Sequence, residues 1–159
     1  MKAILDASGF PTYAHIPGSN PRHREDLFDE ICASVTPDMT VSDLSKTSAW
    51  QSGLDLYRHG YFWEAHEVLE AVWMQCPQNS VERYFVQAII QITNARLKLI
   101  MKRPKAAGRL FDKASTLFHE AGLQSDRPIL ETPLAFVEIE LQTLDTLLEP
   151  VIISKNMEI

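Results

Sequence analysis

The sequence predicts an all-α protein, a compact bundle of about six helices. Three observations lead to this fold class. Apolar residues recur at helical spacing over most of the 159-residue chain, and proline and glycine stand at the boundaries of these periodic segments. No segment convincingly alternates apolar and polar residues as a half-buried strand would. A chain of this length can bury a core without disulfides or structural metal.

The amino-terminal part is predicted to hold an extended arm and two helices. Residues 1–20 show no helical period and contain two of the nine prolines. The pair Asn20 and Pro21 is typical of an N-cap followed by proline at the first helical position, which predicts a helix over about 21–35. A second helix is predicted over about 43–59, and Gly60 ends it.

Two further helices are predicted on either side of Pro77. The third covers about 62–75 and stops before this proline. Ser80 caps a fourth, long helix over about 81–101. Because the loop between them is short, we expect these two helices to be antiparallel neighbours in direct contact.

The last two helices are predicted to begin at prolines. Pro104 starts a fifth helix that ends near Gly122. Thr132 and Pro133 start a sixth, in which apolar residues from 134 to 148 repeat at helical spacing. In the tail, residues 151–153 form the one run that suits a strand, and these apolar side chains could pair two subunits as a homodimer.

Two segments 41 residues apart resemble each other weakly. Each has a tight turn, then a small residue one turn into a helix (Ala65 and Ala106), then a leucine four residues later (Leu69 and Leu110). This is the packing logic of tetratricopeptide-like helical hairpins. We therefore expect the bundle to be built around antiparallel hairpins of this kind.

We expect a single helical domain over 21–149, between an extended arm over 1–20 and a tail over 150–159. The two cysteines share no motif with each other or with a histidine, which excludes a zinc ribbon, a CxxC redox motif and a disulfide framework. No apolar run resembles a signal core or a membrane span, so we expect a cytoplasmic protein without a membrane partner.

Charge is spread unevenly along the chain. Between residues 83 and 111 there are seven basic residues and no acid, so the rest of the chain carries a net charge of −13 within a total of −6. Such a cluster produces a local field that attracts an anion or an acidic partner, or else it decorates the exposed end of a helical hairpin. Nucleic acid is not the expected partner, because no aromatic or glycine-rich motif accompanies the basic residues.

The predicted helix over 62–75 places a histidine and a glutamate beside its buried face. On a helical wheel this face consists of Phe62, Ala65, Leu69 and Val72. His66, Glu70 and Trp73 lie together along one edge of it. Glu64 and Glu67 point toward solvent. The run is not HExxH, because its fifth position is Glu70, so a zincin site is excluded.

The predicted helix over 81–101 carries one narrow polar stripe. Apolar side chains cover most of its circumference, which predicts that the helix is largely buried. The stripe consists of Arg83, Gln87, Gln91, Asn94 and Lys98. Buried amides must find hydrogen-bond partners. If the stripe does not simply face solvent, it lines a groove opposite His66 and Glu70.

The stretch 53–73, followed by Arg83 and by residues 87–91, resembles the signature of domain-of-unknown-function family 309. That pattern runs G-x-Y-x-E-A-H-E-x-L-E-x-x-W, then R-x-x-x-Q-x-x-I-Q, and the resemblance covers about residues 48–118. It implies a small all-helical protein with no established activity. The signature positions in this chain are Glu64, His66, Glu67, Glu70, Trp73, Arg83, Gln87 and Gln91. Many members carry a histidine where this chain has Lys98, which weakens a metal interpretation.

The first functional interpretation is a site for a small anionic molecule in the groove between the third and fourth helices. Arg83 and Lys98 would hold a carboxylate or phosphate. The complete set of expected ligand-binding residues is Arg83, Gln87, Gln91, Trp73 and Lys98. The expected catalytic residues are His66, as acid or base, and Glu70, which orients it. Any chemistry would be proton transfer or hydrolysis by water, because no nucleophile stands in a recognisable motif.

Two other interpretations stay open. The hairpins could form a protein-interaction module with a tetratricopeptide-like groove, or the chain could be a metal-binding helical protein. In the metal case the ligands would be His66 and Glu70, but the fourth helix lacks the carboxylates of a di-iron bundle. The sequence does not identify a cofactor and does not decide whether the protein is an enzyme.

The arm also has two open interpretations. It is either a flexible terminus, or its Tyr13 and the Pro17–Gly18 turn pack over the groove. In the second case Arg22 or His23 would come to the edge of the His66 site and partly close it.

Overall fold

The computed structural model describes residues 9–124 and 127–157. Within these residues there are seven helices and no strand, so the predicted all-α fold class is confirmed. The helices are α1 (Asp29–Cys32), α2 (Val41–Leu44), α3 (Ser48–Arg58), α4 (Phe62–Gln75), α5 (Val81–Ile100), α6 (Pro104–Gln124) and α7 (Leu134–Met157).

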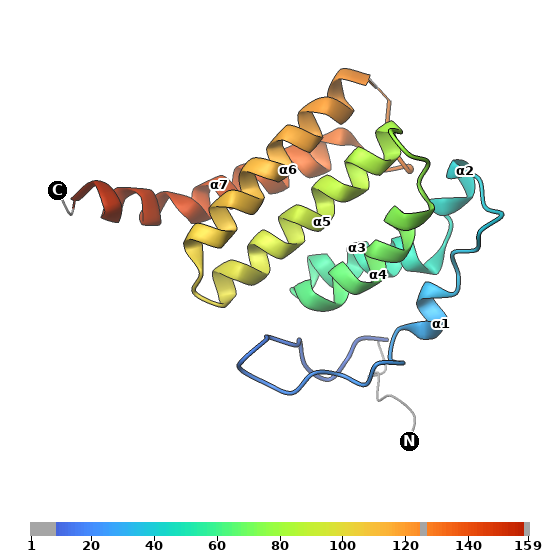
Figure 1. Ribbon diagram of the computed structural model, residues 1–159, viewed down its shortest axis with the longest axis horizontal. Coiled ribbons are helices and arrows are strands. Elements are labelled where there is room, and N and C mark those ends of the chain that lie inside the picture. Colours follow the sequence, from blue (N-terminus) through green and yellow to red (C-terminus); the bar gives the residue numbers. More distant parts are fainter. Residues whose placement is uncertain (1–8, 125–126, 158–159) are drawn as a thin grey trace.

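Consecutive helices from α3 to α7 pack against one another, and α7 also returns to contact α5. Figure 1 shows α3 and α4, α4 and α5, and α5 and α6 as antiparallel pairs joined by short connections. Helix α5 therefore lies between the α3–α4 hairpin on one side and α6 with α7 on the other. The predicted direct contact between the helices over 62–75 and 81–101 is present.

Local signals fix the ends of the central helices. The hydroxyl of Ser80 accepts the N–H of Arg83 at 3.1 Å, which caps α5 where the sequence predicts. Gly60, with φ of +83°, ends α3 in the left-handed conformation that glycine adopts without strain. After it, the N–H of Tyr61 returns to the carbonyl of Leu56 at 2.9 Å.

The core follows α5 and gathers side chains from every neighbouring helix. Its fully buried large residues include Leu44, Leu69, Phe85, Ile89, Ile92 and Leu144. Two polar links tie α3 to the carboxyl-terminal part of this core. The indole N–H of Trp50 donates to the carbonyl of Leu130 at 3.2 Å, and the hydroxyl of Tyr57 donates to the carboxylate of Glu140 on α7.

Three sequence predictions of local structure are wrong. The helix over 21–35 shrinks to α1, because Asn20 caps no helix and instead binds its own segment, donating to the carbonyl of Ala14 at 2.9 Å. The helix over 43–59 divides into α2 and α3, because Thr47 accepts the N–H of Trp50 and starts a new helix. The tail residues 151–153 are not a strand, because α7 continues through Pro150 to Met157.

Residues 10–24, which we call the strap, have no helix and run across the amino-terminal end of α4 (Figure 1). The ring of Phe10 stacks on that of Tyr61, with centroids 5.3 Å apart. The hydroxyl of Tyr61 donates to the carbonyl of Pro11 at 3.1 Å. The strap is therefore anchored beside the turn that separates α3 from α4.

Candidate functional site

A buried glutamate holds the strap against α4. The side chain of Glu64 is 0% exposed. Its two carboxylate oxygens accept the backbone N–H of His15 at 3.2 and 3.0 Å, and Nε2 of His23 lies 3.4 Å from Oε2. Burial raises the pKa of Glu64, and the hydrogen bond from His15 partly opposes this shift.

The sequence prediction that Glu64 faces solvent is therefore wrong. A helical wheel places Glu64 opposite the face that α4 packs on the bundle, but the strap covers this second face. The ring of His15 meets the indole of Trp63 edge-on, with centroids 4.9 Å apart. Helix α4 is thus buried on two sides. The apolar periodicity of its sequence predicts the side that packs on the bundle, but not the side that the strap covers.

His66 is held by two polar neighbours. Its Nδ1 donates to the side-chain oxygen of Asn94 on α5, with an N–O distance of 2.6 Å, which places a proton on Nδ1. Its Nε2 lies 3.6 Å from the carboxylate of Glu70, one turn further along α4. In the neutral imidazole Nε2 keeps its lone pair, and a second proton there would face the Glu70 carboxylate.

A cavity beside this histidine, which we call the strap cavity, has a volume of about 550 Å³. It lies where the strap approaches α4, α5 and the start of α6. Its lining residues are Pro17, Gly18, Trp63, His66, Glu67, Asn94, Leu97, Lys98, Met101, Arg103 and Leu110. This lining combines apolar walls, two cations, one carboxylate and the His66–Asn94 pair.

A second cavity, of about 140 Å³, lies on the other side of the His66–Asn94 pair, and we call it the amide cavity. Its lining residues are His66, Glu70, Trp73, Gln87, Ile90, Gln91 and Asn94. Five of the sequence-predicted site residues therefore meet here: His66, Glu70, Trp73, Gln87 and Gln91. Because His66 and Asn94 line both cavities, they form the partition between them.

Arg83 does not belong to this cluster. Its guanidinium donates to the carbonyls of Trp73 and Cys76 at 3.3 and 2.9 Å, and it stacks over the ring of Trp73 at 4.0 Å from the centroid. The predicted contact of Arg83 with Glu70 or His66 is wrong. The guanidinium instead hydrogen-bonds carbonyls at the end of α4, which have no partner within the helix. Lys98 lines the strap cavity instead, away from Gln87 and Gln91.

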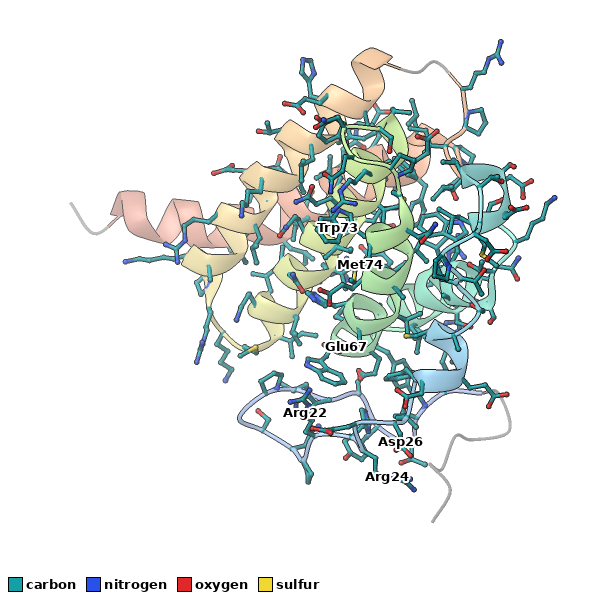
Figure 2. The ribbon with its side chains drawn as sticks, turned by 45° about the vertical axis from the view of Figure 1, so that its right-hand side comes forward. Arg22, Arg24, Asp26, Glu67, Trp73 and Met74 are labelled. Carbon is teal, nitrogen blue, oxygen red and sulfur yellow. The ribbon has the colours of Figure 1, made fainter. Side chains whose placement is uncertain are left out.

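The strap cavity contains residues that the sequence analysis missed or placed in solvent. The wheel predicts that Glu67 faces solvent, but Glu67 lines the strap cavity. It lies on the side of α4 that faces the strap, and the strap carries Arg22 and Arg24 (Figure 2). Trp63 and Arg103 carried no distinguishing motif. Pro17 and Gly18 line this cavity beside His66, in the direction of the second interpretation of the arm. Tyr13 does not line it and donates to the carbonyl of Pro21 instead, and His23 reaches Glu64 rather than His66.

A third hollow, of about 230 Å³, lies between the strap and α1. It shares Trp63 and Glu67 with the strap cavity and also contains Cys32. Burial, and then the carboxylates of Asp29 and Glu67, raise the pKa of the Cys32 thiol. This thiol is therefore not activated as a nucleophile.

Within the part of the chain that the structure describes, no group of three or more His, Cys, Asp and Glu side chains is arranged to hold a metal ion. None of its helices is both long enough and apolar enough to cross a membrane.

Residues 50–110 match the model of the domain of unknown function DUF309, which confirms the family resemblance. The matched segment covers most of α3, all of α4 and α5, and the first part of α6. The strap and α7 lie outside it. Comparisons with curated proteins and with solved structures gave no match.

Proposed function

We propose that this chain, whose residues 50–110 carry a DUF309 domain, binds a small anionic molecule in the strap cavity. The observation that supports this function is a pair of cations, Lys98 and Arg103, on the wall of a cavity of about 550 Å³. The side chains of both are free of ion pairs and hydrogen bonds to the other described residues.

The surroundings of the two cations strengthen the argument. Residues 98–109, where α5 ends and α6 begins, hold five basic residues and no acid, which favours a positive field at this end of the α5–α6 hairpin. A cavity of a few hundred Å³ with apolar walls and a few charged groups is the usual form of a small-molecule site. The ligand's anionic group would pair with Lys98 and Arg103, and its apolar part would pack on the walls.

His66 supplies an imidazole that can transfer a proton at this wall. With Nδ1 donating to Asn94, the lone pair on Nε2 is available as a base, and Glu70 would stabilise the imidazolium that forms. The proposed catalytic pair is therefore His66 with Glu70. Because His66 lines both cavities and Glu70 only the amide cavity, this pair would act where the two cavities adjoin, by proton transfer to or from the ligand or by hydrolysis with a water that His66 activates.

Substitution of the two cations tests the binding proposal. We expect Lys98→Met and Arg103→Met each to weaken binding of phosphate, citrate or benzoate at least tenfold in isothermal titration calorimetry. Lys113→Met is the matched control, because Lys113 is an exposed lysine on α6 that lines no cavity described here. Unchanged affinity in both cavity variants, or binding of none of the three anions, would contradict the proposal.

A second candidate function, a protein-interaction module, has one supporting observation. Helix α7 exposes two large apolar side chains, Ile139 at 58% and Leu147 at 45%. These two residues lie about two turns apart on α7, and an exposed apolar patch along one helix favours a partner or a second copy of the chain. Light scattering of the intact chain and of Ile139→Lys tests this: a dimer that the variant dissociates would support it, and a monomer in both would remove the homodimer.

A further inference from the structure

We infer that the ligand of the strap cavity is a zwitterion: an anion that also carries an ammonium group, attached to an apolar body. This inference rests on the proposed function and specifies its ligand class. It follows from the one carboxylate on the wall of the cavity, that of Glu67.

The Glu67 carboxylate has no partner among the described residues. It makes no hydrogen bond and no ion pair there, although the strap brings Arg22 close to the same end of α4 (Figure 2). The guanidinium of Arg22 lies over the ring of Trp63 instead, 5.4 Å from its centroid. An acceptor with up to four lone-pair positions therefore lines the cavity unused.

The two cations of the cavity are also apart from this carboxylate. Neither Lys98 nor Arg103 comes within ion-pair distance of Glu67, because no such pair occurs among the described residues. The three side chains belong to three different places in the chain: α4, the last turn of α5 and the connection to α6. The cavity thus has one negative position and one positive region that do not neutralise each other.

This division of charge selects against a simple anion. A carboxylate or phosphate bound at Lys98 and Arg103 would displace water from the cavity that the half-buried Glu67 lines, without giving its carboxylate a donor. Removing water from a charge that has no partner is costly. A ligand whose second end donates an N–H removes that cost. Discrimination of this kind is large, because the penalty comes from the polar group of the protein that is left unpaired.

The walls indicate what kind of body carries the two charged groups. Trp63, Leu97, Met101 and Leu110 present apolar surface. A volume of about 550 Å³ suits a body of the size of an amino acid side chain or somewhat larger. The structure therefore assigns the ligand to the amino acids with apolar side chains, or to amine-bearing phosphates, whose charge pattern is the same.

Matched probes that differ in the amino group test the inference. The carboxylate pair is phenylalanine and hydrocinnamate, and the phosphate pair is phosphoethanolamine and ethyl phosphate. We expect the amine-bearing member of at least one pair to bind the intact chain at least tenfold more tightly in isothermal titration calorimetry. The pair that responds identifies the anionic group.

Two variants test whether the preference for the amine-bearing probe arises in the strap cavity. Glu67→Gln should bring the two members of that pair to within about twofold of each other, whereas Lys98→Met should weaken both members. Glu120→Gln, an exposed glutamate on α6, is the control and should change neither. If hydrocinnamate or ethyl phosphate binds as tightly as its amine-bearing partner and still depends on Lys98, the zwitterion inference fails and the anion site stands. If none of the four probes binds, both fail.

Discussion

The carboxylate of Glu64 on α4 accepts the backbone N–H of His15 on both of its oxygens, at 3.2 and 3.0 Å. This contact joins residues that are 49 positions apart in the chain. It fixes the part of the strap that immediately precedes Pro17 and Gly18, which form one wall of the strap cavity. The shape of the candidate site therefore depends on a carboxylate that does not line it.

Replacement of Glu64 by alanine should destabilise the fold. Glu64→Ala would leave the N–H of His15 buried without an acceptor, which costs about 1–3 kcal/mol in the free energy of unfolding. Glu67→Ala, on the same helix, removes a carboxylate without a hydrogen bond and should change this free energy by less than about 0.5 kcal/mol. Urea denaturation measures both, and equal losses would argue against a special role for Glu64.

The raised pKa of Glu64 gives a pH dependence with a defined sign. Just above the ordinary value of 4.5, the unfolded chain has released this proton while the folded chain still holds it. The folded state then binds more protons, so its stability falls as the pH rises through this window, by at most about 1.4 kcal/mol per pH unit for one group.

Glu64→Gln isolates this titration, because the amide oxygen can still accept from His15 but takes up no proton. We expect the unfolding free energy of the intact chain, minus that of Glu64→Gln, to decrease as the pH is raised from 4.5. The same difference is measured between His23→Gln and the double variant that also carries Glu64→Gln. This second comparison is needed because the His23 imidazole faces the same carboxylate. A difference that increases with pH would mean that the hydrogen bond outweighs desolvation.

Arg83 should contribute to stability and not to ligand binding. Arg83→Met removes the donors to the carbonyls of Trp73 and Cys76 and should lower the unfolding free energy by about 1–2 kcal/mol. Arg83→Lys should restore only part of this, because an ammonium cannot reproduce the stacked, forked geometry of the guanidinium. If Arg83→Met has normal thermal stability but no longer binds the anion, Arg83 is a ligand-binding residue and this prediction is wrong.

Two helical glycines should respond in opposite directions to alanine. A Cβ on Gly53 would lie 2.5 Å from Cδ2 of Leu69, which is too close, so Gly53→Ala should cost about 1–3 kcal/mol. A Cβ on Gly108 in α6 meets nothing within 4 Å, so Gly108→Ala should stabilise the chain by about 0.5–1 kcal/mol. Thermal melts of the two variants test whether α3 and α4 approach as closely as the structure has them.

The central helices could be predicted from sequence because their signals are local. The boundaries of α4, α5 and α6 follow from Gly60, Ser80 and Pro104, each of which acts within a turn of its own position. The amino-terminal region could not be predicted in this way. Asn20 and Pro21 have the composition of a helix start, but the side chain of Asn20 binds the backbone of the strap instead.

The site was predictable where it lies between two neighbouring helices. Gln87 and Gln91 were expected to meet His66, and the structure brings all three to the amide cavity, while their roles stay a prediction. The strap cavity was not predictable from a helical wheel. A wheel gives the angular position of Glu64 and Glu67, but it does not show that a segment from far along the chain covers them.

The order of synthesis determines when the strap can pack against α4. Its residues are made before those of α4, and at 5–20 residues per second the 49 positions between His15 and Glu64 take roughly 2–10 s to translate. During this interval the strap has no partner, while afterwards the hairpins of α3 to α6 can form from contacts between adjacent helices. Closing a loop of this length carries an entropic cost that such hairpins avoid. A nascent chain would therefore form the α3 to α6 hairpins before the strap encloses its cavity.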